Sequence, residues 1–224
     1  MTYKKLVSEP MPDYTKGEEI FNMVTHIVGG GIGVIILIST VIIAALKHIN
    51  AWGIVVLVIY GISVVALYTV SSIYHGLHAS IGKRVFRILD HCTIYFLIAG
   101  TSTPICIIAM GWCWQSITIL AIEWIGGILG IVLNAIDMNN KIVKVVSMLL
   151  YILLGWAIVF IPGAVKLLEP IEFLFILLGG ILYMIGVLFY TIGGKKRYSH
   201  SIWHIWCDLA TISQFIGVLF ILLR

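Results

Sequence analysis

The sequence predicts an all-α integral membrane protein, a bundle of seven transmembrane helices. Of its 224 residues, 61% are hydrophobic and only 11% are charged, with a mean hydropathy of +1.09. Soluble domains carry roughly 25% charged and about 45–50% apolar residues. The apolar residues gather in seven segments, each long enough to cross about 30 Å of hydrocarbon as a helix. Because these long runs show no alternation with a period of two, they favour helices over a β-barrel.

The seven segments are separated by short polar or proline-containing breaks. The breaks fall at residues 47–50, 78–87, 111–114, 137–142, 162–172 and 193–200. Proline and glycine at positions 162 and 163 end the fifth segment, because proline cannot continue a helix. The predicted helices cover residues 20–46, 52–73, 88–110, 115–136, 143–161, 173–192 and 201–223.

The domain organisation is simple because seven spans leave little of the chain for anything else. Residues 1–17 contain Pro10, Pro12 and several charges, and they are predicted to form a flexible cytoplasmic arm. Residues 18–224 form the membrane domain. The four cysteines form no CxxC pair, so neither a zinc ribbon nor a disulfide scaffold is indicated.

The positive charges predict the orientation of the chain in the membrane. Eleven of the 14 lysines and arginines fall on one side of the predicted bundle and three on the other. Cytoplasmic loops are enriched in these residues, which places the amino terminus in the cytoplasm and the carboxyl terminus outside. The eleven are Lys4, Lys5, Lys16, Lys83, Arg84, Arg87, Lys141, Lys144, Lys195, Lys196 and Arg197; the three are Lys47, Lys166 and Arg224.

Polar residues near the membrane boundary are informative because a buried polar group in lipid is costly unless it has a partner. Four groups of them converge on the cytoplasmic ends of the first, second, third and seventh helices. They are Glu19, Asn22 and His26; Ser71 and His75; Asp90 and His91; and His200 and His204. Spacings of three, four or seven residues place members of a group on one face of a helix.

These residues predict a metal site. His200 and His204 lie one turn apart, and His75 adds a third imidazole from another helix, which suits a zinc ion with one open position. Asp90 is a candidate orienting carboxylate or base for a bound water, and Ser71 lies one turn from His75. The alternative is that all of them are interfacial side chains that reach the headgroups.

The sequence does not decide the roles of the other polar residues within the apolar segments. His26 either hydrogen-bonds to Asn22 or Glu19 or lines the same cavity, whereas His91 is expected to pack elsewhere. Asp208 shares a stripe with His200 and His204 and could bond a ligand imidazole or contact a substrate. Glu123 lies deeper, in the fourth segment, and is expected to be a structural hydrogen-bonding acid or to pair with another helix.

Read in order, these motifs resemble the hemolysin III family, the bacterial branch of the progestin and adipoQ receptor superfamily. The resemblance covers essentially the whole chain. The matching pieces are Glu18-Glu19-Ile20-Phe21-Asn22 with Thr25-His26, Ser71-Ser72-Ile73-Tyr74-His75, Leu89-Asp90-His91 and His200-Ser201-Ile202-Trp203-His204. The chain departs from the pattern at Ser213-Gln214-Phe215, where bacterial relatives often have a histidine before the phenylalanine.

The resemblance implies a zinc ion held by His75, His200 and His204, with a water supported by Asp90 and with Ser71 nearby. Related receptors are thought to hydrolyse ceramide-like lipid amides, and haemolysis and membrane maintenance are reported for bacterial members. The leading hypothesis is therefore a zinc-dependent hydrolase of lipid amide or ester bonds in the bacterial plasma membrane. The alternatives are a membrane-homeostasis or sensor protein with a structural zinc, and a pore-forming haemolysin. Membrane lipids are the expected partners, and no nucleic acid is expected.

Overall fold

The computed structural model describes residues 11–192 and 196–224. Most of the predicted arm, and three of the cations used in the charge count, Lys4, Lys5 and Lys195, lie outside these residues. The expectation of a flexible arm therefore remains a prediction.

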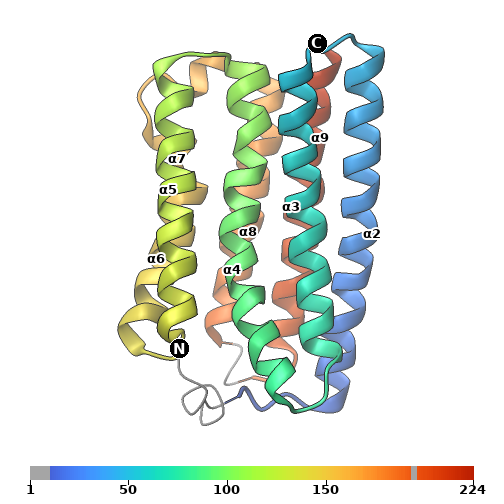
Figure 1. Cartoon of the computed structure of the whole chain (residues 1–224), viewed down its shortest axis with the longest axis vertical. Coiled ribbons are helices and arrows are strands. Elements are labelled where there is room, and N and C mark those ends of the chain that lie inside the picture. The colour runs from blue at the N-terminus through green and yellow to red at the C-terminus, as the bar shows by residue number, and fades with distance from the viewer. Residues whose placement is uncertain (1–10, 193–195) are drawn as a thin grey trace.

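The described residues form an all-helical bundle without a strand, as predicted, in which the long helices run side by side (Figure 1). Six helices are long and apolar enough to cross a membrane, counting α4 and η1 as one. The elements are α2 (Lys16–Leu46), α3 (Ala51–Gly76), α4 (Ile81–Pro104), η1, a π-helix (Ile105–Met110), α5 (Trp114–Asp137), α6 (Lys141–Gly155), α7 (Ala157–Phe160), η2, a 3₁₀-helix (Val165–Leu167), α8 (Pro170–Ile192) and α9 (Ser199–Leu223).

The fifth predicted segment is the one that differs, because it is divided rather than continuous. The 15 residues of α6 end at Gly155, and the four residues of α7 follow Trp156. Trp156 has φ −105° and ψ 6°, outside the regular helical range, and Gly155 beside it has the weakest helix propensity after proline. The structure thus contains six helices of spanning length among its described residues, and the fifth of the seven predicted segments is interrupted.

The third segment begins earlier than predicted. Ser80 caps α4 by accepting a hydrogen bond from the Lys83 backbone N–H at 3.1 Å, so the predicted polar loop with Lys83, Arg84 and Arg87 is largely helical. Asp90 consequently lies in the third turn of α4 and not at its start. Pro104 lacks an N–H donor, and the helix continues past it as the wider π-helix η1.

The start of α2 is fastened to the start of α9. Thr15 and Glu18 form a capping box, in which the Glu18 carboxylate accepts from the Thr15 N–H at 2.9 Å. The other oxygen of Glu18 accepts a hydrogen bond from the Tyr198 backbone N–H at 2.7 Å. Because Tyr198 immediately precedes α9, this buried carboxylate brings two helices distant in the sequence to one level.

Helices α2, α4, α6 and α9 begin at one end of the bundle, where α3, α5 and α8 finish (Figure 1). We name this end the site end. At the opposite end, Arg224 lies 3.4 Å from the Glu172 carboxylate and donates to the Ala109 carbonyl at 2.6 Å, which ties α9 to the start of α8 and to η1. The outer surface carries many exposed large apolar side chains, as expected of helices in contact with lipid.

Candidate metal site

His200 and His204 occupy the first turns of α9 and face the interior of the bundle. Their Nε2 atoms lie 3.1 Å apart, as the spacing of four residues predicts. His204 is 2% exposed and His200 is half-buried. The pair therefore presents two imidazole nitrogens to the same point.

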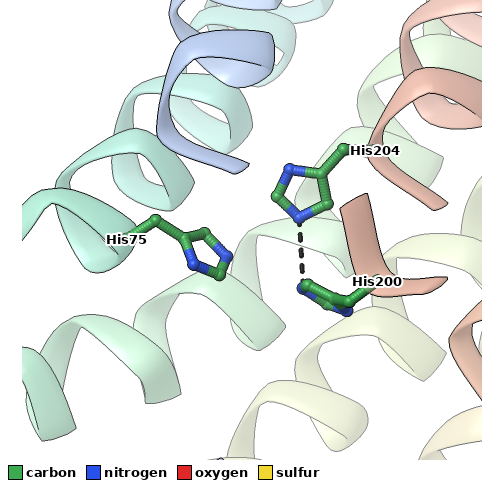
Figure 2. Close-up of side chains that lie close together, drawn as sticks. All are labelled: His75, His200 and His204. Atoms are coloured by element: carbon green, nitrogen blue, oxygen red, sulfur yellow. Dashed lines mark hydrogen bonds between the residues drawn. The ribbon is translucent and has the colours of Figure 1, made fainter. Parts of the chain in front are cut away.

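His75 lies in the last turn of α3 and completes a three-histidine cluster. Figure 2 shows its ring pointing toward the pair from α9. One ring nitrogen from each of His75, His200 and His204 lies within 4.8 Å of the others. The structure thus brings together the three residues that the sequence predicted as metal ligands.

Hydrogen bonds from the Nδ1 atoms of His75 and His204 hold these two rings in a fixed orientation. His75 Nδ1 donates to the Glu19 carboxylate at 2.6 Å, and His204 Nδ1 donates to the Asn22 carbonyl at 3.2 Å. The donating nitrogen carries the proton, so each Nε2 keeps a free lone pair. His75 Nε2 is buried and has no hydrogen-bond partner among the described residues. Histidines that bind metals commonly donate their other N–H to a carboxylate or carbonyl in this way.

The spacing of the nitrogens can be compared with a zinc coordination sphere. Two imidazole ligands at about 2.0–2.1 Å in tetrahedral geometry place their nitrogens ~3.3 Å apart. The 3.1 Å between His200 and His204 is close to this value, whereas 4.8 Å is wider and requires a small adjustment of a side chain. Three neutral imidazoles with one position left open therefore make a cluster that could hold a metal ion.

Ser71 and Asp90 line the same cavity as the histidines. Ser71 lies on α3 one turn before His75 and is 1% exposed, and its hydroxyl is buried beside the Asp90 carboxyl without a hydrogen bond of ordinary geometry. Asp90 is half-buried and reaches the site from α4. Both predicted catalytic residues therefore lie next to the cluster, from two different helices.

The cavity has a volume of about 170 Å³, and its lining is mostly apolar, with polar side chains near the histidines and further ones at Thr101, Ser102 and Gln214. Residues of α3, α4, α6, α7, α8 and α9 line it. Along α8 its lining runs from Tyr190 near His200 to Phe173, a separation of 17 residues or ~25 Å of helix. Most of the intervening lining is apolar, including Val187, Met184 and Ile176. The arrangement is an apolar passage with a polar, metal-competent end.

Sequence reasoning missed the residues that orient the histidines. It placed Glu19 and Asn22 on one stripe of the first helix but suggested His26 as their partner. Their partners are instead His75 and His204. The spacing of Glu19 and Asn22 was a usable signal for their side chains, which both approach His75, whereas the bond to His204 comes from the Asn22 backbone carbonyl. Lys83 was taken for a loop residue, yet it is buried and donates to Glu19 at 2.7 Å.

Tyr14 is a second residue that the sequence did not single out. It precedes α2, and its ring stacks on His200 with centroids 5.1 Å apart and an interplanar angle of 22°. Burial raises the pKa of its hydroxyl well above the ordinary value, so Tyr14 is neutral at every physiological pH. Its aromatic ring covers one side of the cluster.

The remaining polar residues have mixed outcomes. His26 has no hydrogen bond to Asn22 or Glu19; it lines the cavity and stacks on His204 with ring centroids 3.6 Å apart. His91 also lines the cavity, so the expectation that it packs elsewhere is wrong.

The two acids found deeper in the chain lie apart from the cluster. Glu123 is 1% exposed and accepts a hydrogen bond from the Ser102 hydroxyl at 2.9 Å, in keeping with a structural acid. Asp208 packs near Gly29, and its Oδ1 has no hydrogen-bond partner within the described part of the chain. No hydrogen bond joins Asp208 to His200 or His204 in that part of the chain.

Comparison with known proteins relates almost the whole chain to one family. Residues 14–215 match the family model described as Haemolysin-III related. Hemolysin-3 of Bacillus cereus is 38% identical over 214 residues, which are 92% of each chain. The Hemolysin-3 homolog of Bacillus subtilis (strain 168) is 35% identical over 211 residues, 92% of this chain and 95% of that protein. The monocyte to macrophage differentiation factor of Homo sapiens is 23% identical over 188 residues, 77% of this chain and 70% of that protein.

The contacts of Glu19 predict a strong dependence of stability on this residue. In Glu19→Ala the buried Lys83 ammonium loses its carboxylate partner, which should lower the free energy of unfolding by about 3 kcal/mol. Adding Lys83→Met should recover part of that loss, because the unpaired charge is gone. Thermal unfolding of metal-chelated protein in detergent measures both effects, with Asp13→Ala as the exposed control. A double variant no more stable than Glu19→Ala would contradict this account.

Proposed function

This chain belongs to the Haemolysin-III related family and is a multi-pass protein of a bacterial cell membrane, and on that basis we propose that it is a zinc-dependent hydrolase of lipid amide or ester bonds. The observation that carries the proposal is the three-histidine cluster at the polar end of an apolar cavity. The cluster suits a metal, and the cavity suits an acyl chain.

The metal ligands in this proposal are His75, His200 and His204. Their neutral imidazoles favour zinc over the hard cations that prefer oxygen ligands. When bound there, zinc supplies Lewis acidity to a carbonyl oxygen and a water ligand that ionises near neutral pH. Glu19 and Asn22 hold His75 and His204 in the tautomer that leaves Nε2 free.

Asp90 is the residue proposed to move the proton. Asp90 lines the cavity from α4, where its carboxylate can accept the proton of the attacking water and return it to the leaving group. The Ser71 hydroxyl, buried without a good hydrogen-bond partner, can donate to the water or to the substrate carbonyl. Bond cleavage then requires a carbonyl group placed between these two helices.

The substrate class follows from the rest of the cavity. Away from the histidines the lining is mostly apolar, with Thr101, Ser102 and Gln214 as exceptions, so it binds a hydrocarbon chain through the hydrophobic effect and offers few partners to a polar molecule. The scissile bond of a lipid would lie at the polar end, with its acyl chain in the passage. Membrane lipids are therefore the proposed substrates.

A topology of seven crossings with a cytoplasmic amino terminus fits this function. The α5 helix ends at the site end and α8 starts at the opposite end, so the intervening chain has to cross the bundle (Figure 1). Residues 141–160 of α6 and α7 extend over ~30 Å, the thickness of the hydrocarbon. Eight of the described lysines and arginines belong to segments at the site end, which favours a cytoplasmic location for it.

A second candidate is a membrane-homeostasis or sensor protein in which the zinc is structural. The stacking of Tyr14 on His200 favours it, because this ring closes one side of the cluster to water. In that case the open coordination position takes no part in chemistry, and Asp90 is dispensable. Pore formation is a third candidate, because a relative is named Hemolysin-3. A measurement of solute flux through liposomes that contain the protein tests it directly.

Zinc content is the first test. The purified protein should contain about one zinc per chain, and His200→Ala/His204→Ala should lose nearly all of it because two of three ligands are gone. Elemental analysis by mass spectrometry measures this, and size-exclusion chromatography verifies that the variant is folded. His48→Asn is the matched control, since His48 lies at the other end of the bundle with φ 53°, a conformation that asparagine tolerates. Unchanged zinc in the double variant would exclude the site.

The Asp90→Asn variant distinguishes a catalytic role of the zinc from a structural one. The variant should bind zinc normally and release fatty acid from a panel of lipid amides and esters at least ~100-fold more slowly, as expected for loss of a general base. Asp13→Asn, an exposed change before α2, should have no effect. Full physiological activity of the Asp90→Asn variant in cells would instead favour the structural role.

Native cysteines can test the topology. Cys113 lies between η1 and α5 at the end opposite the site, and the Ser116 hydroxyl 3.2 Å away holds the pKa of its thiol below the usual range. A larger thiolate fraction reacts faster at neutral pH. A membrane-impermeant maleimide should therefore label Cys113 in intact cells, and the buried Cys92, Cys106 and Cys207 should not compete.

The controls for topology use a Cys113→Ser background. Lys166→Cys, in the exposed η2 turn, should be labelled in intact cells, because α6 and α7 carry the chain across the membrane. His78→Cys, in the turn at the site end, should be labelled only after the membrane is permeabilised. Labelling of Lys166→Cys only after permeabilisation would contradict the seventh crossing.

A further inference from the structure

A second hollow lies on the outer surface of the bundle, away from the cavity described above. It is a groove of about 550 Å³ between α2 and α3, which we name the α2–α3 groove. Its lining includes His26, Ile27, Gly31, Val34, Thr69 and Ile73. Its volume falls within the range of small-molecule sites, and neither the metal site nor the proposed hydrolysis uses it.

Glycines create this groove. A Cβ atom added at Gly31 would meet no other atom within 4 Å, so the surface is open there. Beneath it the two helices touch, because a Cβ at Gly33 would lie 3.0 Å from Val64. A helix about 10–12 Å across could rest only on the rims of such a slot. A single hydrocarbon chain is thin enough to enter it.

The groove is continuous with the surface that faces the bilayer. Its rim includes Ile27, Val34 and Ile73, which are 55%, 45% and 38% exposed and belong to the apolar belt of a multi-pass membrane protein. The molecules available at this surface are the acyl chains of membrane lipids. An empty slot in lipid would forfeit dispersion contacts on both of its walls, so a chain that fills it is favoured.

Two polar groups inside the groove indicate what kind of lipid fits. His26 borders it, is 4% exposed, and neither of its ring nitrogens has a hydrogen-bond partner among the described residues. Thr69 is exposed in the groove, and its hydroxyl lies 4.0 Å from the position of a Cβ at Gly30. An imidazole N–H and a hydroxyl can both donate to an oxygen acceptor. An unmet donor at this depth is costly, and a lipid carbonyl would satisfy it.

The depth of His26 sets how far a lipid carbonyl must move to reach it. The midpoint of α2 falls near Gly31, so a 30 Å hydrocarbon layer centred there places His26 only ~7 Å inside its boundary. The ester carbonyls of phospholipids mark that boundary. Because side chains on a helix lean toward its amino terminus, and so toward this boundary, a lipid that settles several ångströms into the groove brings its carbonyl to His26 and its acyl chain along Gly31 and Val34.

We propose that the α2–α3 groove binds an ester-linked membrane phospholipid, whose acyl chain occupies the glycine slot and whose carbonyl oxygen accepts a hydrogen bond from His26 or Thr69. The site is distinct from the hydrolase cavity. It meets that cavity only at His26, which borders both hollows and stacks on His204. Lipid bound in the groove therefore contacts His26, whose ring in turn packs on His204 of the histidine cluster.

Photolabelling tests the site. The protein is reconstituted in phosphatidylethanolamine–phosphatidylglycerol vesicles that contain a trace of phosphatidylcholine with a diazirine in its acyl chain, and the labelled peptides are mapped by mass spectrometry. Labels should concentrate on residues 23–34 and 65–77. Gly31→Leu adds bulk to the slot at a position where a Cβ meets no atom within 4 Å, and it raises helix propensity, so it should reduce this labelling ~5-fold while the protein stays folded. Ala121→Leu, which adds the same bulk to the exposed face of α5, is the matched control and should change nothing.

The carbonyl has its own test. An ether-linked probe of the same length lacks the carbonyl oxygens, and the wild-type protein should label several-fold less with it than with the ester probe. His26→Phe combined with Thr69→Val keeps the shapes but removes the donors, so both probes should label it equally. Zinc content, measured in parallel, keeps this outcome separate from that of the proposed hydrolase.

Three results would overturn the proposal. Labels could spread evenly over all lipid-facing helices, or Gly31→Leu could leave the labelling intact. Alternatively, cross-linking could place a second copy of the chain on this face, with no lipid label in the groove. Each of these is distinguishable in the same set of samples.

Discussion

The Glu19 carboxylate is the junction on which the metal site depends. One oxygen accepts from His75 at 2.6 Å and the other from Lys83 at 2.7 Å, so a single side chain of α2 joins the end of α3 to the start of α4. Charges near the membrane boundary are costly unless they are paired. Here the cost is offset because the carboxylate and the ammonium neutralise each other, and the imidazole that donates Nδ1–H to the same carboxylate has no partner on Nε2 among the described residues. The same contact that connects three helices also prepares a ligand.

Asn22, one turn further along α2, extends this arrangement to the last helix. Its Oδ1 accepts from the Ser201 hydroxyl at 2.6 Å, and its backbone carbonyl accepts from His204. Its amide nitrogen lies 3.5 Å from His75 Nδ1. Two consecutive turns of α2 therefore position ligands that are separated by more than a hundred residues in the sequence. The first helix supplies none of the three ligands, yet it sets the geometry of two of them.

His26 lies on the same face of α2, one turn beyond Asn22, and has a different role. Its ring lies flat on His204 and edge-on to Tyr68, so it fills the space behind the cluster with an aromatic surface. His26 is the residue that lines both the inner cavity and the outer groove. The interior of the bundle and its lipid-facing surface thus meet at one side chain, close to the candidate metal ligands.

The sequence by itself determined the class of the protein, the all-helical architecture, the family and the identity of the three clustered histidines. Composition and segment length decide the first two, because lipid tolerates only backbone that satisfies its own hydrogen bonds. The histidines were predictable because His200 and His204 lie one turn apart and helix ends at one membrane face must meet at one depth.

Only the tertiary structure decided which residues orient those ligands. The partners of His75 and His204 come from a helix remote in the sequence, and a spacing along one helix does not reveal which neighbour it faces. The interruption at Trp156 and the early start of α4 also depended on local capping and packing, which override an apolar pattern. The α2–α3 groove could not be foreseen from Gly30 and Gly31 alone, since glycines permit either close contact or open space and the neighbouring helix decides between them.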